Sequence, residues 1–275
     1  MNIFNWLFAS GMLTQTFMIH AFLAGTAIAV MSAFIGLFVV LRKWTFVAHA
    51  LPKIGFAGAS GAVLLAQSPL LGVVVFSIGG AVAIGNLQRR GRADAMIALT
   101  LVLALGVGGL FLSWSNNFAQ NTYGLLFGQV VGISGAQVWW TLIMSAVCIL
   151  AVLLLYRPLL LTTLRSDWAQ SRGIHSGVVD VLFLLVAGVA ASLTVPLVGV
   201  LLNFSLIVAP TAAAMKLAKR PHSVLFWSLG ISVFSIWISL VLAYHIGWPV
   251  SFFVTTVTTV IYLLSIAIQR YWLEG

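Results

Sequence analysis

Residues 17–43 read FMIHAFLAGTAIAVMSAFIGLFVVLRK, an unbroken apolar run that ends on the basic pair Arg42–Lys43. The hydrocarbon core of a bilayer is about 30 Å thick, and an α-helix crosses it with roughly 20 consecutive apolar residues. Basic residues directly after such a run favour the cytoplasmic side. The segment 17–41 therefore predicts a membrane-spanning helix whose C-terminal end faces the cytoplasm.

The composition of the whole chain matches this first segment. Of the 275 residues, 62% are apolar and 6% are charged, and the mean hydropathy is +1.14. Soluble domains carry about 25% charged residues, so this composition excludes a water-soluble fold. The net charge of +9 comes from Lys and Arg in short clusters between apolar runs. We therefore expect no basic face that would bind nucleic acid, and we do expect contact with membrane lipid.

Residues 1–275 are predicted to form one all-α domain, a polytopic transmembrane helical bundle with eight or nine spans. Lys and Arg follow every second span, and the connections between them carry neither residue. This pattern predicts that the N-terminus lies outside and the C-terminus in the cytoplasm. The segment 123–135 is apolar but short, so a re-entrant placement stays open. The candidate spans are 17–41, 45–66, 70–87, 95–113, 138–156, 178–194, 197–215, 224–244 and 250–268.

Lys53 is the most informative single charge. If the second span begins near Thr45, Lys53 lies about 12 Å along it, at 1.5 Å per residue. An ionisable residue at that depth indicates a functional site. If the span begins near Ile54 instead, Lys53 is a snorkelling lysine at a helix end, and both interpretations stay open. His49 precedes Lys53 by four residues and would share its helix face.

The energy source is constrained by what the sequence lacks. No G-x-x-x-x-G-K-[ST] motif occurs, so any nucleotide would be bound by another chain. Proton relays and sodium sites usually use carboxylates inside the membrane. The carboxylates of this chain all map to the predicted cytoplasmic side or its rim, which disfavours a proton- or sodium-driven carrier. They are Asp94, Asp167, Asp180 and Glu274.

Residues 58–61 read GASG and resemble the G-x-S-G serine of rhomboid-type intramembrane proteases. Such an enzyme also needs a histidine on a neighbouring helix to activate Ser60. Small residues that allow close helix contact explain the tetrad better. An intramembrane serine hydrolase is therefore only an alternative interpretation.

Four segments, taken together, resemble the membrane subunits of the zinc/manganese/iron ABC importers. Residues 42–53, RKWTFVAHALPK, are similar to the family signature F-x-G-D-A-L-x-H that follows a basic pair. Residues 125–128 read LLFG, similar to an L-F-G element. Residues 198–214, VGVLLNFSLIVAPTAAA, resemble V-G-x-L-L…L-I-x-P-A-A-T-A. Residues 167–174, DWAQSRGI, resemble the cytoplasmic helix that docks on the ATPase.

The resemblance implies a transport subunit that is not itself an enzyme, in the inner membrane of a bacterial cell. It implies a cytoplasmic ATPase that binds the ATP, while this chain binds no cofactor. It also implies an extracytoplasmic substrate-binding protein and a second permease copy, with a homodimer expected. The ATPase is expected to dock on a segment at about 157–177. Its expected contact residues are Arg165, Asp167, Trp168, Arg172 and Gly173.

The family implies a divalent metal as cargo, with zinc favoured and manganese or iron possible, and His49 as a metal ligand. At the family's metal-contacting Asp and His, this sequence has His49 and Lys53, and Val102 stands where a histidine is expected. A small anion or a metal chelate is an alternative cargo, because Lys53 would attract it. A non-transporting membrane scaffold is a further alternative. The predicted pathway residues are His49, Lys53, Ser60, Asn203, Ser205 and Thr211.

Overall fold

The structure is a computed structural model that describes residues 15–88, 93–115, 133–199 and 203–273. These residues form ten α-helices and a short π-helix, and no strand occurs among them. The prediction of an all-α bundle is therefore confirmed. The helices are α2 (Thr16–Leu41), α3 (Thr45–Leu64), α4 (Pro69–Gln88), α5 (Ala93–Ser113), α7 (Gly135–Leu164), α8 (Ser166–Ser171), α9 (Ser176–Val198), α10 (Asn203–Leu217), α11 (Pro221–Ile246), α12 (Val250–Ile268) and the π-helix η2 (Gln269–Leu273).

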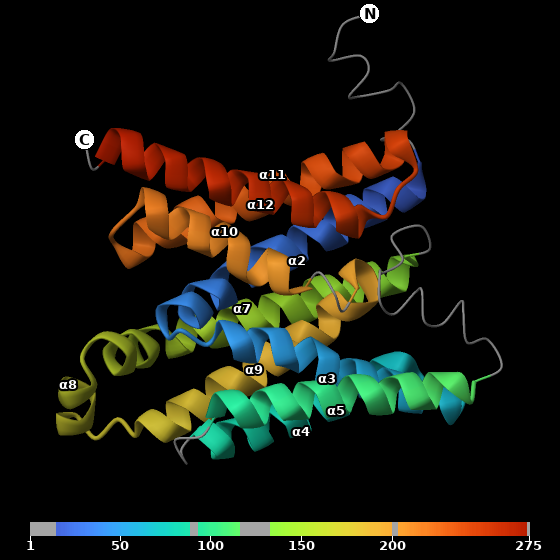
Figure 1. The fold of residues 1–275 in the computed structure, drawn as a ribbon, viewed down its shortest axis with the longest axis horizontal. Coiled ribbons are helices and arrows are strands. Elements are labelled where there is room, and N and C mark those ends of the chain that lie inside the picture. Colours follow the sequence, from blue (N-terminus) through green and yellow to red (C-terminus); the bar gives the residue numbers. More distant parts are fainter. Residues whose placement is uncertain (1–14, 89–92, 116–132, 200–202, 274–275) are drawn as a thin grey trace, which may run out of the picture.

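Helix α2 lies in the middle of the bundle (Figure 1). On one side it packs against α10 and α11, which also contact α12. On the other side lie α3, α4, α5 and α9, with α7 packed against both α2 and α9. The long helices run in roughly the same direction or its reverse, so each has one end near α8 and the other end far from it (Figure 1).

Eight helices are long and apolar enough to cross a membrane, as predicted. The predicted seventh span, 197–215, differs in its bounds, because α9 continues to Val198 and α10 begins only at Asn203. Gly199, whose φ of +86° lies in the left-handed region, ends α9. With 15 residues, α10 is about 22 Å long, too short to cross a 30 Å core. Residues 200–202 lie outside the described part of the chain.

The predicted fifth span, 138–156, is two turns shorter at its C-terminal end than the helix that forms. Helix α7 runs from Gly135 to Leu164 and passes through Pro158. At its start, Ser134 caps the helix by accepting a hydrogen bond from the Gln137 backbone N–H at 3.3 Å. Residues 123–132, for which a re-entrant placement was left open, lie outside the described residues.

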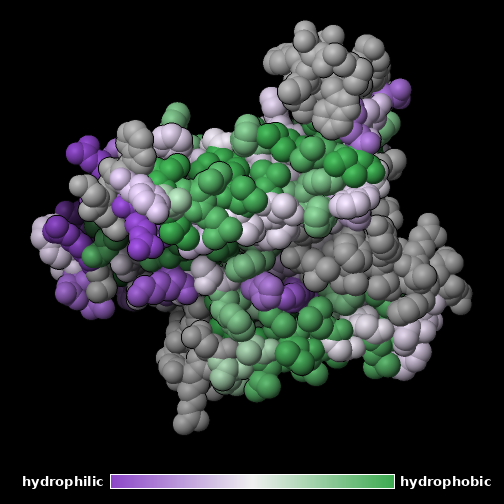
Figure 2. Space-filling view, turned by 45° about the horizontal axis from the view of Figure 1, so that its top comes forward, coloured by the Kyte–Doolittle hydropathy of each residue, from purple (hydrophilic) through white to green (hydrophobic). Residues whose placement is uncertain are grey.

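Hydrophilic residues gather at the end of the bundle where α8 lies (Figure 2). Helices α2, α7, α10 and α12 all end there, and α9 and α11 begin there (Figure 1). The basic residues that follow these helices therefore meet at one surface, as the loop charges predict. An apolar band covers the flank of the bundle beyond them (Figure 2). That this end faces the cytoplasm stays a prediction.

A close backbone contact lies between α3 and α4, where Gly58 and Gly72 face each other. A Cβ atom on Gly58 would lie 2.1 Å from the carbonyl oxygen of Gly72, and one on Gly72 would lie 2.0 Å from that of Gly58. Only glycine fits at either position, because a backbone carbonyl cannot move aside as a side chain can. This contact fixes the distance between α3 and α4.

We predict that Gly58→Ala separates α3 from α4 and lowers the free energy of unfolding by roughly 3 kcal/mol, the upper end of overpacking costs. Thermal unfolding of the detergent-solubilised protein, followed by tryptophan fluorescence, measures the effect. Gly79→Ala in α4 is the matched control, since no atom lies within 4 Å of its Cβ position. Equal melting temperatures for the two variants would show that the contact is not tight.

Candidate translocation path and docking element

Lys53 lies inside α3, not at its start. The helix begins at Thr45, and the Lys53 side chain is 7% exposed. Its ammonium group donates a hydrogen bond to Nε2 of His49, one turn earlier on the same face. The contact leaves Nδ1 of the imidazole to carry the ring proton in the neutral form. The two residues that the sequence places together are therefore bonded to each other in the fold.

The start of α10 lies beside this pair. The His49 ring packs edge-on against Phe204, with 4.8 Å between ring centroids. Phe204 stands between Asn203 and Ser205, two of the predicted pathway residues. Asn203 is completely buried, and neither its Oδ1 nor its Nδ2 has a hydrogen-bond partner, whereas Ser205 is half-buried. An unpaired buried amide is costly, which makes Asn203 a candidate for binding a ligand.

Thr211 lies two turns further along α10, where α10 meets both α2 and α11. Its hydroxyl shares a hydrogen bond of 2.8 Å with that of Ser228. A Cβ atom on Gly36 would lie 2.6 Å from the Thr211 hydroxyl and 2.1 Å from the carbonyl oxygen of Ile207. Thr211 is therefore engaged in holding three helices together in this conformation.

Ser60 lies two turns beyond Lys53 on α3 and is completely buried. Its hydroxyl donates to the carbonyl oxygen of Phe56 at 2.8 Å, within its own helix. Of the six predicted pathway residues, the structure thus joins His49 and Lys53 and sets them beside the start of α10. Ser60 and Thr211 form their hydrogen bonds with other residues, Phe56 and Ser228.

The described residues contain no group of three or more His, Cys, Asp or Glu side chains that could hold a metal ion. His49 is the one predicted metal ligand, and its Nε2 already accepts from Lys53. Val102, where the resemblance implies a histidine, is 65% exposed on α5. A metal ion within a single copy of this chain would therefore meet imidazole, amide and hydroxyl groups in place of a carboxylate cage.

The predicted docking segment forms the short helix α8 and its flanking turns. Trp168 is 55% exposed, and the Arg165 guanidinium lies 4.8 Å from the centre of its ring. Asp167 and Arg172 are also exposed. Gly173 ends the helix with a φ of +73°, and the next amide, of Ile174, bonds back to the Ala169 carbonyl oxygen at 3.0 Å. The segment thus presents an aromatic and charged face.

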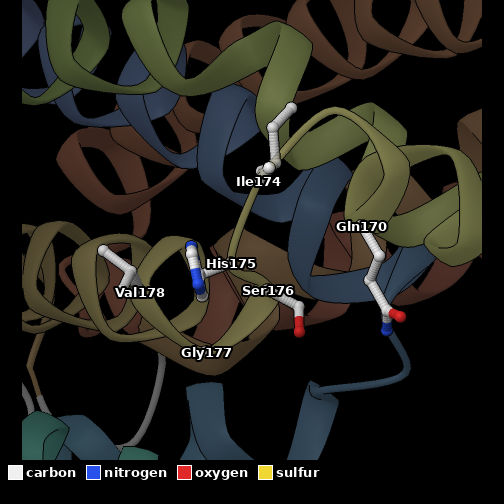
Figure 3. Close-up of a pocket in the computed structure, with 7 residues that line it drawn as sticks. Gln170, Ile174, His175, Ser176, Gly177 and Val178 are labelled. Carbon is white, nitrogen blue, oxygen red and sulfur yellow. The ribbon is translucent and has the colours of Figure 1, made fainter.

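A concavity of about 460 Å³ opens beside α8, where the chain turns into α9 (Figure 3). Both polar and apolar atoms form its wall, and the His175 and Ser176 side chains stand at the turn (Figure 3). Such a hollow suits a protruding side chain of a docked protein. The lining residues are Gln170, Gly173, Ile174, His175, Ser176, Gly177 and Val178.

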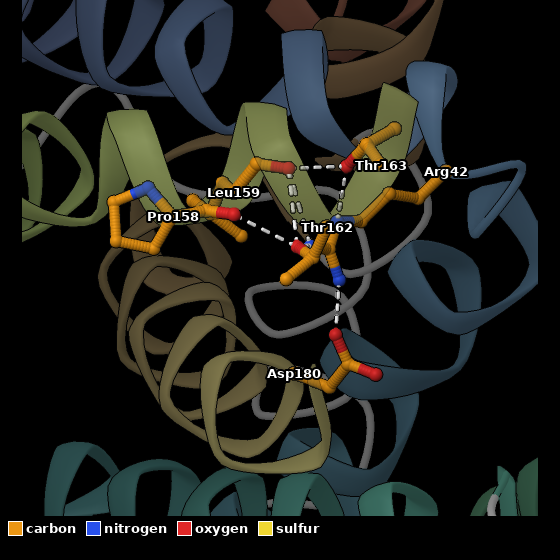
Figure 4. Close-up of polar contacts among 6 residues, drawn as sticks. All are labelled: Arg42, Pro158, Leu159, Thr162, Thr163 and Asp180. Carbon is orange, nitrogen blue, oxygen red and sulfur yellow. Dashed lines mark hydrogen bonds and ion pairs between the residues drawn. The ribbon is translucent and has the colours of Figure 1, made fainter. Parts of the chain in front are cut away.

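One polar cluster was missed by the sequence analysis. The Arg42 guanidinium forms an ion pair with Asp180 and hydrogen bonds to Thr162 and Thr163 (Figure 4). The sequence pattern indicated Arg42 only as a topology signal and as part of the basic pair before the family signature, and not as a buried, paired side chain. Two features of the sequence could have indicated this cluster: the threonine pair near the end of α7 and the single carboxylate near the start of α9.

The fold and these features define a polytopic helical membrane protein with a buried polar pair inside and a short, exposed helix at one end. The chain matches the model of the ABC 3 transport family over residues 14–269, and it belongs to that family. It is therefore a membrane permease and not an enzyme. The serine hydrolase alternative is excluded with it.

Two curated relatives and one solved structure illustrate this membership. The manganese transport system membrane protein MntC of Halalkalibacterium halodurans is 26% identical over 78% of this chain and 74% of its own length. The high-affinity zinc uptake system membrane protein ZnuB of Haemophilus influenzae is 24% identical over 81% and 86%. A chain of PsaBC from Streptococcus pneumoniae, solved with a Fab, shares the fold with a TM-score of 0.87 at 19% identity, covering 98% of this chain and 99% of its own.

We predict opposite stability effects at two buried polar residues of α10. Asn203→Leu removes an unpaired amide of similar size and raises the free energy of unfolding by about 1–2 kcal/mol. Thr211→Val removes a paired hydroxyl and lowers it by about 0.6 kcal/mol, the average for such bonds between membrane helices. Chemical denaturation in detergent measures both. A loss of stability in Asn203→Leu would mean that the amide is paired in the folded protein.

Proposed function

We propose that this chain is the membrane permease subunit of an ABC importer for a divalent transition metal ion, in the inner membrane of a bacterial cell. The match to the ABC 3 transport family over residues 14–269 carries this proposal. Relatives named for manganese and for zinc transport support a metal as cargo. We favour zinc, with manganese and iron as the other candidates, because an imidazole at the path suits zinc and manganese prefers oxygen ligands.

In this proposal the energy for transport comes from ATP that a partner chain hydrolyses. A cytoplasmic ATPase binds and hydrolyses ATP and docks on α8, where Trp168 and Arg165 offer an exposed contact face. This chain binds no cofactor of its own. A substrate-binding protein delivers the ion at the far end, which places the start of α2 outside and the end of α12 in the cytoplasm. The basic residues that follow α2, α7, α10 and α12 support this orientation, because these helices end near α8 (Figure 1).

The ion would pass between two copies of the permease, along α3 and the start of α10. His49, Lys53 and Ser60 line the path from α3, and Asn203, Ser205 and Thr211 from α10. Four of these six side chains are buried within one chain, so this proposal requires the path to be closed in the present conformation. Movement of α3 against α10 would open it, since the His49–Phe204 ring contact joins the two helices.

A whole-cell metal measurement tests the proposal. Zinc, manganese, iron, copper and cobalt are determined in a strain that lacks the gene and in the strain with the gene restored. We expect a selective fall in zinc that the intact gene reverses. A selective fall in manganese or iron would keep the importer and correct the cargo. No change in any metal would reject a metal cargo and favour an anionic solute. ATPase turnover indifferent to every solute would favour the scaffold.

We predict that Lys53→His traps zinc. Two imidazoles four residues apart on one helix face form a zinc-binding pair, so the ion is held and not released. Uptake falls about tenfold, the effect of roughly 1.4 kcal/mol on a barrier, and zinc co-purifies with the permease. Lys219→His, at an exposed lysine outside the path, is the control. Unchanged uptake in Lys53→His would remove Lys53 from the path.

We predict that Trp168→Ala weakens binding of the ATPase about thirtyfold, the effect of the ~2 kcal/mol typical of an interface tryptophan. The permease fold is unaffected, because the ring is more exposed than buried. Binding is measured between the purified ATPase and the detergent-solubilised permease. Trp140→Ala is the matched control, since that ring is 63% exposed near the start of α7, far from α8. If both variants bind as the wild type does, the docking face lies elsewhere.

A further inference from the structure

The guanidinium of Arg42 is buried where α2 ends, with the side chain 6% exposed. A buried guanidinium is tolerated only if its N–H groups find acceptors. Its Nη1 faces the Asp180 carboxylate, Nε donates to the Thr163 hydroxyl at 2.9 Å, and Nη2 donates to the Thr162 hydroxyl and, at 3.4 Å, to the Leu159 carbonyl oxygen. Four acceptors therefore hold one side chain in place (Figure 4).

These acceptors lie on both sides of the docking helix. Thr162 and Thr163 stand in the last turn of α7, immediately before α8. Asp180 stands near the start of α9, immediately after the turn that follows α8. Arg42 thus ties the segment that enters α8 and the segment that leaves it to the same point on α2. A displacement of α8 that carries these two ends along must displace Arg42 or break charge-assisted hydrogen bonds.

From Arg42 the chain enters α3 through a turn formed by Lys43 and Trp44. Lys43 has a φ of +58°, in the left-handed region, and the Trp44 amide donates to the Val39 carbonyl oxygen at 2.8 Å. The Trp44 ring lies 4.9 Å from the Arg42 guanidinium and packs 6.1 Å from the Phe183 ring of α9. The next residue begins α3. The turn is therefore held by the same cluster that frames α8.

Helix α3 connects this turn to the buried His49–Lys53 pair. His49 follows the turn by about one helical turn, and Lys53 lies roughly 12 Å along the helix from Thr45. A continuous series of contacts and chain segments thus runs from the end of α7 and the start of α9, which flank α8, through Arg42 and the turn at 43–44, to the His49–Lys53 pair. Spatial continuity alone does not demonstrate coupling between two sites, so a functional measurement is needed.

We propose that Arg42, clamped between Asp180 and the threonine pair of α7, is the positioning residue that passes movement of α8 to α3. This inference rests on the proposed function, because the movement originates in an ATPase docked on α8. Without these contacts of Arg42 (the clamp), α8 moves with the ATPase and α3 does not move with it. ATP is then hydrolysed without moving cargo.

The test measures transport and ATP hydrolysis together. The permease, its ATPase and its binding protein are reconstituted in liposomes, with Zn²⁺ and Mn²⁺ supplied separately. Arg42→Lys keeps the charge but loses the forked geometry, and Asp180→Asn keeps the shape but loses the charge. Arg220→Lys, at an exposed arginine at the same end of the bundle, is the matched control.

We expect both clamp variants to hydrolyse ATP within about twofold of wild type and to move about tenfold less metal per ATP, within the usual range of coupling between linked sites. The control keeps the wild-type ratio. A merely structural role would lower hydrolysis and transport together, in step with the amount of folded complex. An unchanged ratio of metal to ATP in both clamp variants would overturn the proposal.

A second readout separates failure of the clamp from failure of the proposed cargo. Cys148 is the single cysteine of the chain, so Cys148→Ala gives a background in which Phe46→Cys, at an exposed position on α3, carries one fluorophore. Adding ATP to the complex changes its emission if α3 moves. We expect that change to be lost with Asp180→Asn, whether or not any metal is transported. An equal response with and without Asp180→Asn would contradict the clamp.

Discussion

Lipid gives helices no hydrophobic reason to associate, because hydrocarbon tails are as apolar as leucine side chains. The bundle depends instead on close backbone approach at a few glycines. Gly58 and Gly72 join α3 to α4, and Gly36 lets α2 lie against α10, where a Cβ atom would meet the Ile207 carbonyl oxygen. Since α2 is central, its contact at Gly36 also sets the distance between α10 and the rest of the bundle. The arrangement around His49 follows from these contacts.

The two buried cations of the described interior are treated in opposite ways. Arg42 is surrounded by a carboxylate and three further acceptors, so its charge is neutralised and its position fixed. Lys53 bonds to an imidazole, which brings no negative charge. A buried charge without a counter-ion carries a desolvation cost that a passing ligand could relieve. The environment of Arg42 is therefore that of a structural contact between helices. The environment of Lys53 is that of a group whose charge an ion or ligand in the proposed path would affect.

The sequence predicts most of the fold, because long apolar runs leave a chain few alternatives in a membrane. It misplaces the end of α7, which continues through Pro158, and the start of α10, because α9 continues to Val198 and ends at Gly199. It predicts the His49–Lys53 pair from helical spacing alone. It misses the Arg42 cluster, since contacts between residues 42, 162, 163 and 180 come from three helices and leave no local pattern. Long-range polar contacts of this kind need the folded structure to be seen.

The chemistry of the proposed path bears on how a metal ion would move through it. An ion that crosses a membrane must bind well enough to enter and weakly enough to leave. A cage of carboxylates would hold a divalent ion firmly, whereas one imidazole, one amide and a few hydroxyls hold it weakly. A permease that receives its cargo from a binding protein does not need to select the ion again. An ammonium beside the imidazole lowers the affinity for a cation further, which favours release over storage. Lys53 would then set the rate of passage, and recognition of the metal would lie in the delivering protein.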